Sequence, residues 1–147
     1  MYKFYKSNTN LIRVRNNNDK PLCIELNTNL SSDIFVICNN HYIQCLVNDH
    51  FKHINLQIFQ EAEAYLQQEQ LLNFRTFKTN EDDDKITLKL QRAYNRYKTT
   101  FFDKDQPTIS TSVSMYKQAT LIISLDFIWL SNTTWGFTWK VDSIKII

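Results

Sequence analysis

The feature that most constrains the fold is an alternation of apolar and polar residues in the last part of the chain. It runs through residues 85–91 and returns in 119–130 and 135–141. A period of two residues is typical of strands that bury one face. The sequence therefore predicts half-buried β-strands over 84–147, with a short strand or connection at 109–113.

One of these strands holds the only glycine of the chain, Gly136, between Trp135 and Trp139. A glycine inside a strand marks a bend or the close approach of another backbone or a ligand. Both explanations stay open at this stage, and Lys140 is expected on the same strand face as Gly136. The apolar phase flips after this strand, which predicts a β-bulge at 142–143.

The period of the apolar residues changes between residues 1–48 and residues 49–72. The first region holds short apolar runs that predict strands, with a hairpin turning at Asn39 and Asn40 because asparagine tolerates positive φ. In the second region apolar residues recur every three or four positions, which predicts one amphipathic helix packed on a sheet. The expected fold is one α+β domain over the full 147 residues, mostly β and dominated by antiparallel strands, with extra N-terminal strands, one helix and further strands over 84–147.

Several classes of catalytic and metal site are excluded by the residues available. A chain with one glycine cannot form a glycine-rich phosphate loop, and it contains neither G-x-S-x-G nor H-E-x-x-H. His50 and His53 have no completing ligands nearby, and the acidic run at 81–84 is typical of a solvated turn. We therefore expect no enzyme activity, no cofactor and no metal.

The cysteines Cys23, Cys38 and Cys45 each lie in an apolar run and are odd in number. This pattern predicts free thiols in a reducing compartment, with at least two of the three buried. The N-terminus is polar and basic, and no apolar run approaches the roughly 20 residues of a membrane span. The expected location is therefore intracellular, without a membrane partner.

Aromatic residues are interleaved with basic ones in the segment RAYNRYK, residues 92–98. Single-strand binders use flat rings to stack on bases and cations to neutralise phosphates. If this segment served only as a hairpin turn, we would expect Gly, Asn or Asp in it. The tyrosines and cations found there instead favour nucleic-acid contact. Because the net charge is only +2, binding requires local clustering of Lys and Arg. The candidate nucleic-acid-binding residues are Arg92, Tyr94, Arg96, Tyr97, Lys98, Phe74, Arg75, Trp129, Trp135, Gly136 and Lys140.

The order of these segments resembles a known family. The chain is similar here to the C-terminal half of OB-fold single-stranded DNA-binding proteins of large DNA viruses and some phages. The segments that carry the resemblance are, in order, K-I-T-L-K-L, the aromatic and basic turn, T-T-F-F-D-K-D, a long apolar strand ending in F-I-W, and W-G-F-T-W-K-V-D-S-I-K-I. The resemblance covers residues 84–147. It implies a five-stranded Greek-key barrel whose open face takes single-stranded DNA, or RNA, without sequence preference.

The same resemblance implies a viral protein that supports genome replication or recombination in the host cytoplasm, the nucleus or a viral replication site. The upstream strands and helix would then be an elaboration or a surface for homo-oligomerisation. The alternatives are a viral structural or assembly protein that makes protein contacts through its β surface, and an inhibitor or host-interaction module. Exposed rings of Tyr94, Tyr97 or the tryptophans beside Lys and Arg favour nucleic acid, whereas buried rings and an exposed aliphatic patch favour assembly.

Overall fold

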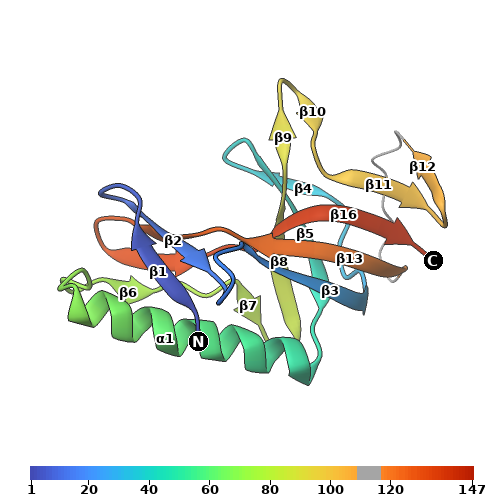
Figure 1. The fold of residues 1–147 in the computed structure, drawn as a ribbon. Helices are drawn as coiled ribbons and strands as arrows, with labels where there is room; N and C mark the ends of the chain where they lie inside the picture. Colours follow the sequence, from blue (N-terminus) through green and yellow to red (C-terminus); the bar gives the residue numbers. More distant parts are fainter. Residues whose placement is uncertain (109–116) are drawn as a thin grey trace. The chain divides into compact units, whose positions relative to one another are not determined.

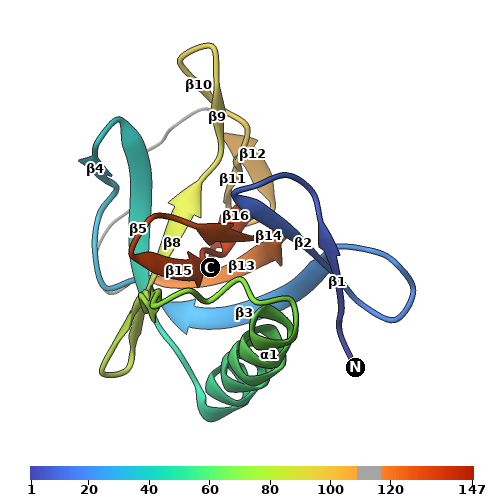
Figure 2. The same ribbon diagram turned by 90° about the vertical axis from the view of Figure 1, so that its left-hand side faces the viewer.

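The computed structural model of the chain describes residues 1–108 and 117–147. These residues form sixteen strands and one α-helix, which confirms the mostly β class with one helix (Figures 1 and 2). The strand or connection expected at 109–113 lies outside the described residues. Within the described ranges, no helix combines the length and apolar character needed to cross a membrane.

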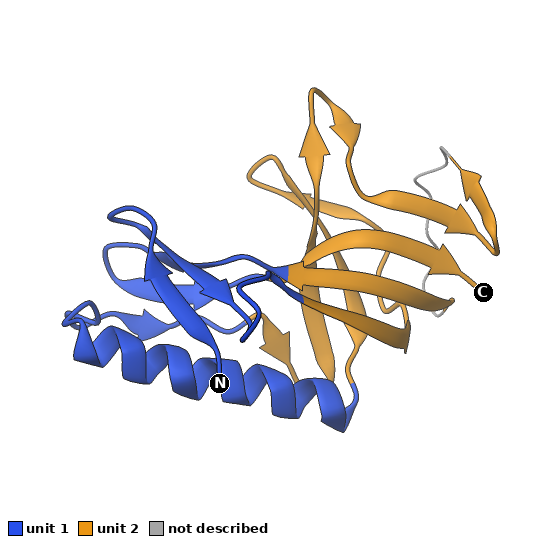
Figure 3. Ribbon diagram, in the orientation of Figure 1, with its two compact units in different colours: residues 1–22, 48–79, 125–138 blue, residues 23–47, 80–124, 139–147 orange. Residues whose placement is uncertain are grey.

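The chain forms two compact units, coloured separately in Figure 3. Each unit is assembled from three segments that alternate along the sequence. Unit 1 consists of Met1–Leu22, Asn48–Thr79 and Leu125–Thr138, and unit 2 of Cys23–Val47, Asn80–Ser124 and Trp139–Ile147. The division into these units does not test the expectation of a single domain, which stays a prediction.

Unit 1 is a five-stranded sheet with the order β1-β2-β14-β15-β6 and the helix α1 (Asp49–Gln68). Its strands are β1 (Lys3–Lys6), β2 (Leu11–Arg15), β6 (Thr76–Phe77), β14 (Phe127–Leu130) and β15 (Thr134–Phe137). The Phe59 ring of α1 stacks on Trp135 of β15 with 5.6 Å between ring centroids, and it lies 4.6 Å from the ring of Phe77 in β6. The helix therefore packs on a sheet, as its apolar spacing predicts.

The helix spans Asp49–Gln68 and so lies within the predicted range of 49–72. Gln70 adopts a left-handed conformation with φ of 59°, and the Leu71 N–H donates to the Leu66 carbonyl at 2.8 Å. This is the Schellman arrangement, in which a left-handed residue ends the helix and satisfies its last carbonyls. Glycine is the usual residue at that position, and a glutamine there carries no stop signal in the sequence.

Unit 2 is built around a mixed sheet in which β12-β11-β16-β8-β5-β4 lie in that order. Further pairings lie outside this strand order: β13 pairs with β16 and with β3, and β7 pairs with β8. β9 and β10 pair with each other as a separate hairpin. The strand ladders close neither sheet on itself in the described residues. The strands are β3 (Leu22–Asn29), β4 (Phe35–Ile37), β5 (Asn40–Leu46), β7 (Glu81–Asp82), β8 (Lys85–Leu90), β9 (Arg92–Ala93), β10 (Arg96–Tyr97), β11 (Thr100–Asp103), β12 (Gln106–Thr108), β13 (Gln118–Leu125) and β16 (Lys140–Ile146).

The core of unit 2 follows the alternation in the sequence. β8 buries Ile86, Leu88 and Leu90, and the residues between them are partly exposed. β5 and β13 bury alternate residues in the same way. Because successive side chains of a strand point to opposite faces, this phase places Lys89 of β8 on the outer face of the sheet.

The strand predicted over 119–130 is divided in the structure, so that prediction is wrong. β13 ends at Leu125 and pairs with β16 in unit 2, whereas β14 starts at Phe127 and pairs with β2 and β15 in unit 1. The carbonyl of Asp126, between the two strands, accepts from the N–H of Val14 at 2.8 Å. Both halves alternate in phase, so periodicity alone cannot reveal a change of sheet.

The predicted β-bulge is confirmed in β16. Ile122 of β13 pairs with Ser143 and Ile123 pairs with Val141, which leaves Asp142 as the extra residue. A bulge of this kind shifts side chains to the other face, and this explains the phase flip in the sequence.

The three cysteines are free, but only Cys45 is buried, so the prediction of two buried thiols is wrong. Cys23 occupies an outward position of β3, and Cys38 lies in the turn before β5 with φ of 49°. Burial raises the pKa of the Cys45 thiol to about 12, a shift that a hydrogen bond with Thr28 opposes.

Candidate nucleic-acid interface

The candidate residues are divided between the two units. Unit 1 contains Phe74, Arg75, Trp129, Trp135 and Gly136, and unit 2 contains Arg92, Tyr94, Arg96, Tyr97, Lys98 and Lys140.

Gly136 and Trp135 belong to the interior of unit 1. Trp135 is 1% exposed, so its ring is not available for stacking on a base. A Cβ atom added to Gly136 would lie 2.6 Å from Cζ2 of Trp129 and 3.0 Å from the carbonyl oxygen of Lys78. Trp129 is the direct partner of Gly136 in the β14–β15 ladder. The glycine thus permits a close approach, and the approaching group is a tryptophan ring of the same unit.

Phe74 and Arg75 lie in the segment between α1 and β6. Phe74 is fully exposed, with φ of 66°. The Arg75 guanidinium donates from Nε to the carbonyl of Ser131 at 2.5 Å and from Nη1 to the carbonyl of Leu71 at 2.6 Å. These bonds join the end of the helical region to the β14–β15 turn, so Arg75 has a structural role in unit 1.

The β9–β10 hairpin of unit 2 presents Tyr94 at its tip. Tyr94 and Asn95 have φ of 53° and 64°, the conformation of a two-residue type I′ turn. Asparagine tolerates this region, whereas for a bulky residue the left-handed conformation costs about 1–2 kcal/mol. Tyr94 is 99% exposed and therefore gains little from packing in return. An exposed tyrosine held in an unfavourable backbone conformation is a candidate contact residue.

The base of this hairpin is fixed to β16 by buried and partly buried hydrogen bonds. The Gln91 N–H donates to Oγ1 of Thr99 at 3.0 Å, and the Thr99 hydroxyl donates to the Val141 carbonyl at 2.6 Å. The Gln91 side-chain amide donates to the carboxylate of Asp142 at 2.6 Å, and the hydroxyl of Ser124 donates to the same oxygen at 3.1 Å. The bulge residue therefore anchors the start of the hairpin.

His41 of β5 lies between Arg92 and Tyr97 of the hairpin. Nε2 of His41 is 2.6 Å from Nη1 of Arg92, and Nδ1 of His41 is 2.7 Å from the hydroxyl of Tyr97. The Arg92 guanidinium also lies over the Tyr97 ring, 5.1 Å from its centroid. Because a guanidinium only donates, Nε2 must be the acceptor and the proton of the neutral ring must reside on Nδ1.

The environment of His41 disfavours its charged form. Desolvation lowers the pKa of His41 from its ordinary value, and the positive charge of Arg92 lowers it further. The imidazole is therefore neutral at pH 7, which agrees with the hydrogen bond from Arg92.

A row of three residues crosses the outer face of the neighbouring strands β5, β8 and β16. Tyr42 pairs with Lys89, and Lys89 pairs with Lys140. All three side chains are partly exposed, and the Tyr42 ring stacks on Phe35 of β4 at 5.8 Å. Lys89 and Lys140 thus place two positive charges directly opposite each other on adjacent strands.

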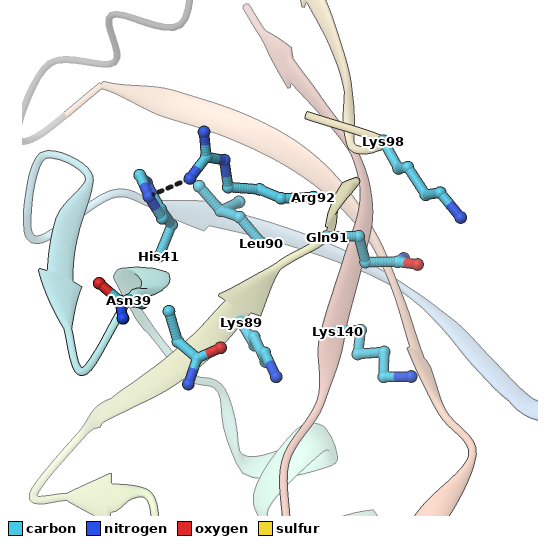
Figure 4. Close-up of a pocket in the computed structure, with 9 residues that line it drawn as sticks. Asn39, His41, Lys89, Leu90, Gln91, Arg92, Lys98 and Lys140 are labelled. Carbon is cyan, nitrogen blue, oxygen red and sulfur yellow. Dashed lines mark hydrogen bonds between the residues drawn. The ribbon is translucent and has the colours of Figure 1, made fainter. Parts of the chain in front are cut away.

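Lys89 and Lys140 of this row and the neighbouring His41 and Arg92 border one cavity of about 310 Å³ (Figure 4). Figure 4 shows the His41 and Arg92 side chains next to each other, with Lys89 and Lys140 on adjacent strands. Its described lining residues are Asn39, Asn40, His41, Lys89, Leu90, Gln91, Arg92, Lys98 and Lys140. Four of them are cations and none is acidic, so the cavity favours an anionic ligand. Its volume is within the usual range of ligand pockets.

Three of the predicted residues, Arg92, Lys98 and Lys140, thus line one cavity. Arg96 and Tyr94 extend from the same hairpin but are not part of the lining. Sequence reasoning missed His41 and Lys89. The alternation over 85–91 places Lys89 on an outer face, but only strand pairing brings Lys140 beside it.

Residues 1–108 and 117–147 contain no group of three or more His, Cys, Asp or Glu arranged to hold a metal ion. Comparison of the chain with protein-family models, curated proteins and solved structures found no match.

Proposed function

We propose that the protein binds single-stranded nucleic acid, DNA or RNA, without sequence preference. The observation that carries the proposal is the cavity lined by four cations and no described acid, next to an exposed tyrosine in a strained hairpin tip. Cations neutralise the phosphates of a single strand, and exposed rings stack on its bases. Support of genome replication or recombination is the role that the family resemblance implies.

The arrangement of five strands in unit 2 supports an OB-like barrel. β13, β3, β5 and β8 are adjacent in that spatial order, which is the fourth, first, second and third of them along the chain. This is the order of a Greek key. β16 lies between β8 and β13, parallel to β8 and antiparallel to β13, so the five strands follow a circle that no ladder of the described residues closes between β3 and β5.

The junction between β3 and β5 is the weakest part of this circle. It consists of one isolated bridge between Leu30 and Cys45 and a hydrogen bond from the Ser31 N–H to the Gln44 carbonyl at 2.9 Å. A partly open barrel is typical of the OB fold. In this proposal the barrel takes β3 and β5 from the N-terminal region and is not limited to residues 84–147.

The position of the cavity supports the same function. OB folds bind oligonucleotides on the face of their second and third strands and the adjoining loops. In unit 2 these strands are β5 and β8, which carry His41 and Lys89 of the cavity. A phosphate beside Lys89 and Lys140 would leave the neighbouring base within reach of Tyr42.

A structural or assembly protein is the second candidate function. Among residues 1–108 and 117–147, the outer strand β4 pairs with β5 alone, and its Val36 and Ile37 are 56% and 55% exposed. Such an edge is a template for pairing with another chain. The exposure of the Tyr94 ring, which is 99% exposed, favours the nucleic-acid function.

The test is titration of fluorescein-labelled oligo-dT, followed by anisotropy, from about 20 mM salt upward. The slope of log K against log salt is about −0.7 for each phosphate contact on a single strand. Replacing both Lys89 and Lys140 by alanine should weaken binding and make the slope less negative by about 1.4. Lys85→Ala is the matched control, because Lys85 lies on the same strand but does not line the cavity.

Two results would contradict the proposal. One is the absence of oligo-dT binding by the unaltered protein at about 20 mM salt, in which case assembly becomes the preferred function. The other is an equal loss of affinity in Lys85→Ala and in the double variant, which would place binding outside the cavity. Circular dichroism of each variant verifies that the strands remain folded.

A further inference from the structure

Arg92 cannot hold its present position once His41 is protonated. Nε2 of His41 accepts the hydrogen bond from Arg92 at 2.6 Å. In the imidazolium form both ring nitrogens are donors, so this acceptor disappears and two positive charges face each other. The Nδ1–H bond to the Tyr97 hydroxyl is compatible with both forms and keeps the ring in place.

We propose that binding of a nucleic-acid phosphate in the cavity is coupled to the uptake of one proton by His41. The inference rests on the proposed function and adds a regulatory property to the same site. Without ligand, His41 is neutral and holds Arg92. With phosphate bound, the His41 imidazolium and the released Arg92 guanidinium both donate to phosphate oxygens. Charge-assisted bonds of this type are about twice as strong as neutral ones.

The groups around His41 determine the direction of this coupling. Arg92 and Tyr97 contact it directly, and Lys89, Lys98 and Lys140 line the same cavity. β4, which pairs with β5, carries only Phe35, Val36 and Ile37, none of them ionisable, and Cys38 follows in the turn. The described lining residues include no carboxylate, so the cations favour neutral His41 and a bound phosphate favours its charged form.

The affinity for nucleic acid should depend on pH with a defined sign. In the free protein the pKa of His41 is lowered by desolvation and by Arg92. A phosphate at the cavity raises that pKa, so the complex holds a proton that the free protein lacks. By linkage, affinity increases as pH falls, by up to about tenfold per pH unit between the two pKa values.

The experiment measures oligo-dT affinity at constant salt between pH 5 and pH 8. Binding should be at least about fivefold tighter at the acidic end for the unaltered protein. His41→Gln retains a neutral acceptor for Arg92 but does not titrate, so its affinity should be nearly independent of pH. The double variant His50→Gln/His53→Gln removes the two exposed helix histidines and should retain the full dependence.

A second measurement follows the ring protons of His41 by NMR, with and without oligo-dT. The proposal requires a higher pKa in the complex. The inference is overturned if this pKa does not rise, or if His41→Gln retains the pH dependence while binding persists. Absence of binding at every pH overturns the proposed function itself, so the two failures are distinguishable.

Discussion

Replacing Gly136 by alanine tests whether the single glycine of the chain accommodates an internal ring or an external ligand. The new Cβ would lie 2.6 Å from Cζ2 and 3.1 Å from Cε2 of Trp129, and 3.0 Å from the carbonyl oxygen of Lys78. The ring can shift, because Trp129 is only partly buried, but the carbonyl belongs to the backbone beside β6. The substitution therefore forces both the ring and the backbone to move.

Two opposing effects set the magnitude. Inserting a methyl group into a packed site costs typically about 1–3 kcal/mol. Alanine also restricts the unfolded chain more than glycine does, which stabilises the folded state by about 0.4–1 kcal/mol where the backbone conformation is compatible. Gly136 has no positive φ, so this gain applies. We expect a net loss of about 1–2 kcal/mol in the free energy of unfolding.

Urea unfolding followed by tryptophan fluorescence measures this loss, and a double-mutant cycle assigns its cause. Trp129→Leu removes the ring that the new methyl group meets. The double variant should be more stable than the sum of the two single effects by about 1 kcal/mol, because residues in contact couple. The folded Gly136→Ala protein should bind oligo-dT like the unaltered protein, since Gly136 does not line the cavity.

An additive cycle would refute the idea that Trp129 requires the glycine. A large loss of oligo-dT binding in a stable Gly136→Ala protein would refute the conclusion that Gly136 accommodates only an internal ring. It would favour instead the close approach of a nucleic-acid backbone to Gly136.

Two further predictions concern the cysteines and the hairpin. Native protein should react rapidly with iodoacetamide at Cys23 and Cys38 and slowly at Cys45, because burial removes access and raises the pKa of the Cys45 thiol to about 12. Mass spectrometry of timed samples measures the three rates, and equal rates would contradict the buried position. Tyr94→Ala should weaken oligo-dT binding by about 1–3 kcal/mol at every salt concentration without changing the salt slope. A changed slope would indicate that Tyr94 acts through the neighbouring cations instead of by stacking.

The sequence predicts local features of this fold well. The alternation over 85–91 identifies β8, the phase flip identifies the bulge at Asp142, and the turn expected at 92–98 is found, although it forms a hairpin of its own. In each case the signal is contained within a few consecutive residues. Burial of one strand face and the geometry of a short turn are local properties, so a local pattern is sufficient.

Long-range pairing accounts for what the sequence does not predict. The segment 119–130 alternates without interruption, yet β13 and β14 belong to different units. The helix ends through a left-handed glutamine, a residue with no preference for that conformation. A tryptophan near basic residues is typical of a base-stacking site, and the sequence predicts Trp135 as one. The rings of Phe59 and Phe77, which come from distant segments of the chain, pack on Trp135 and bury it.

The net charge of +2 does not oppose nucleic-acid binding once the strands are paired. The cavity collects His41 from β5, Lys89 from β8, Arg92 and Lys98 from either end of the β9–β10 hairpin, and Lys140 from β16. Charges farther apart than about 8 Å are largely screened at physiological salt, so a phosphate experiences the nearby cations much more than the acids elsewhere in the molecule. Weak overall charge reduces steering from a distance, but contacts within the cavity act at short range. In the proposed function, affinity depends on how precisely the paired strands position the cations. The hydrogen bonds from Gln91 and Thr99 fix the base of the hairpin that carries Arg92 and Lys98.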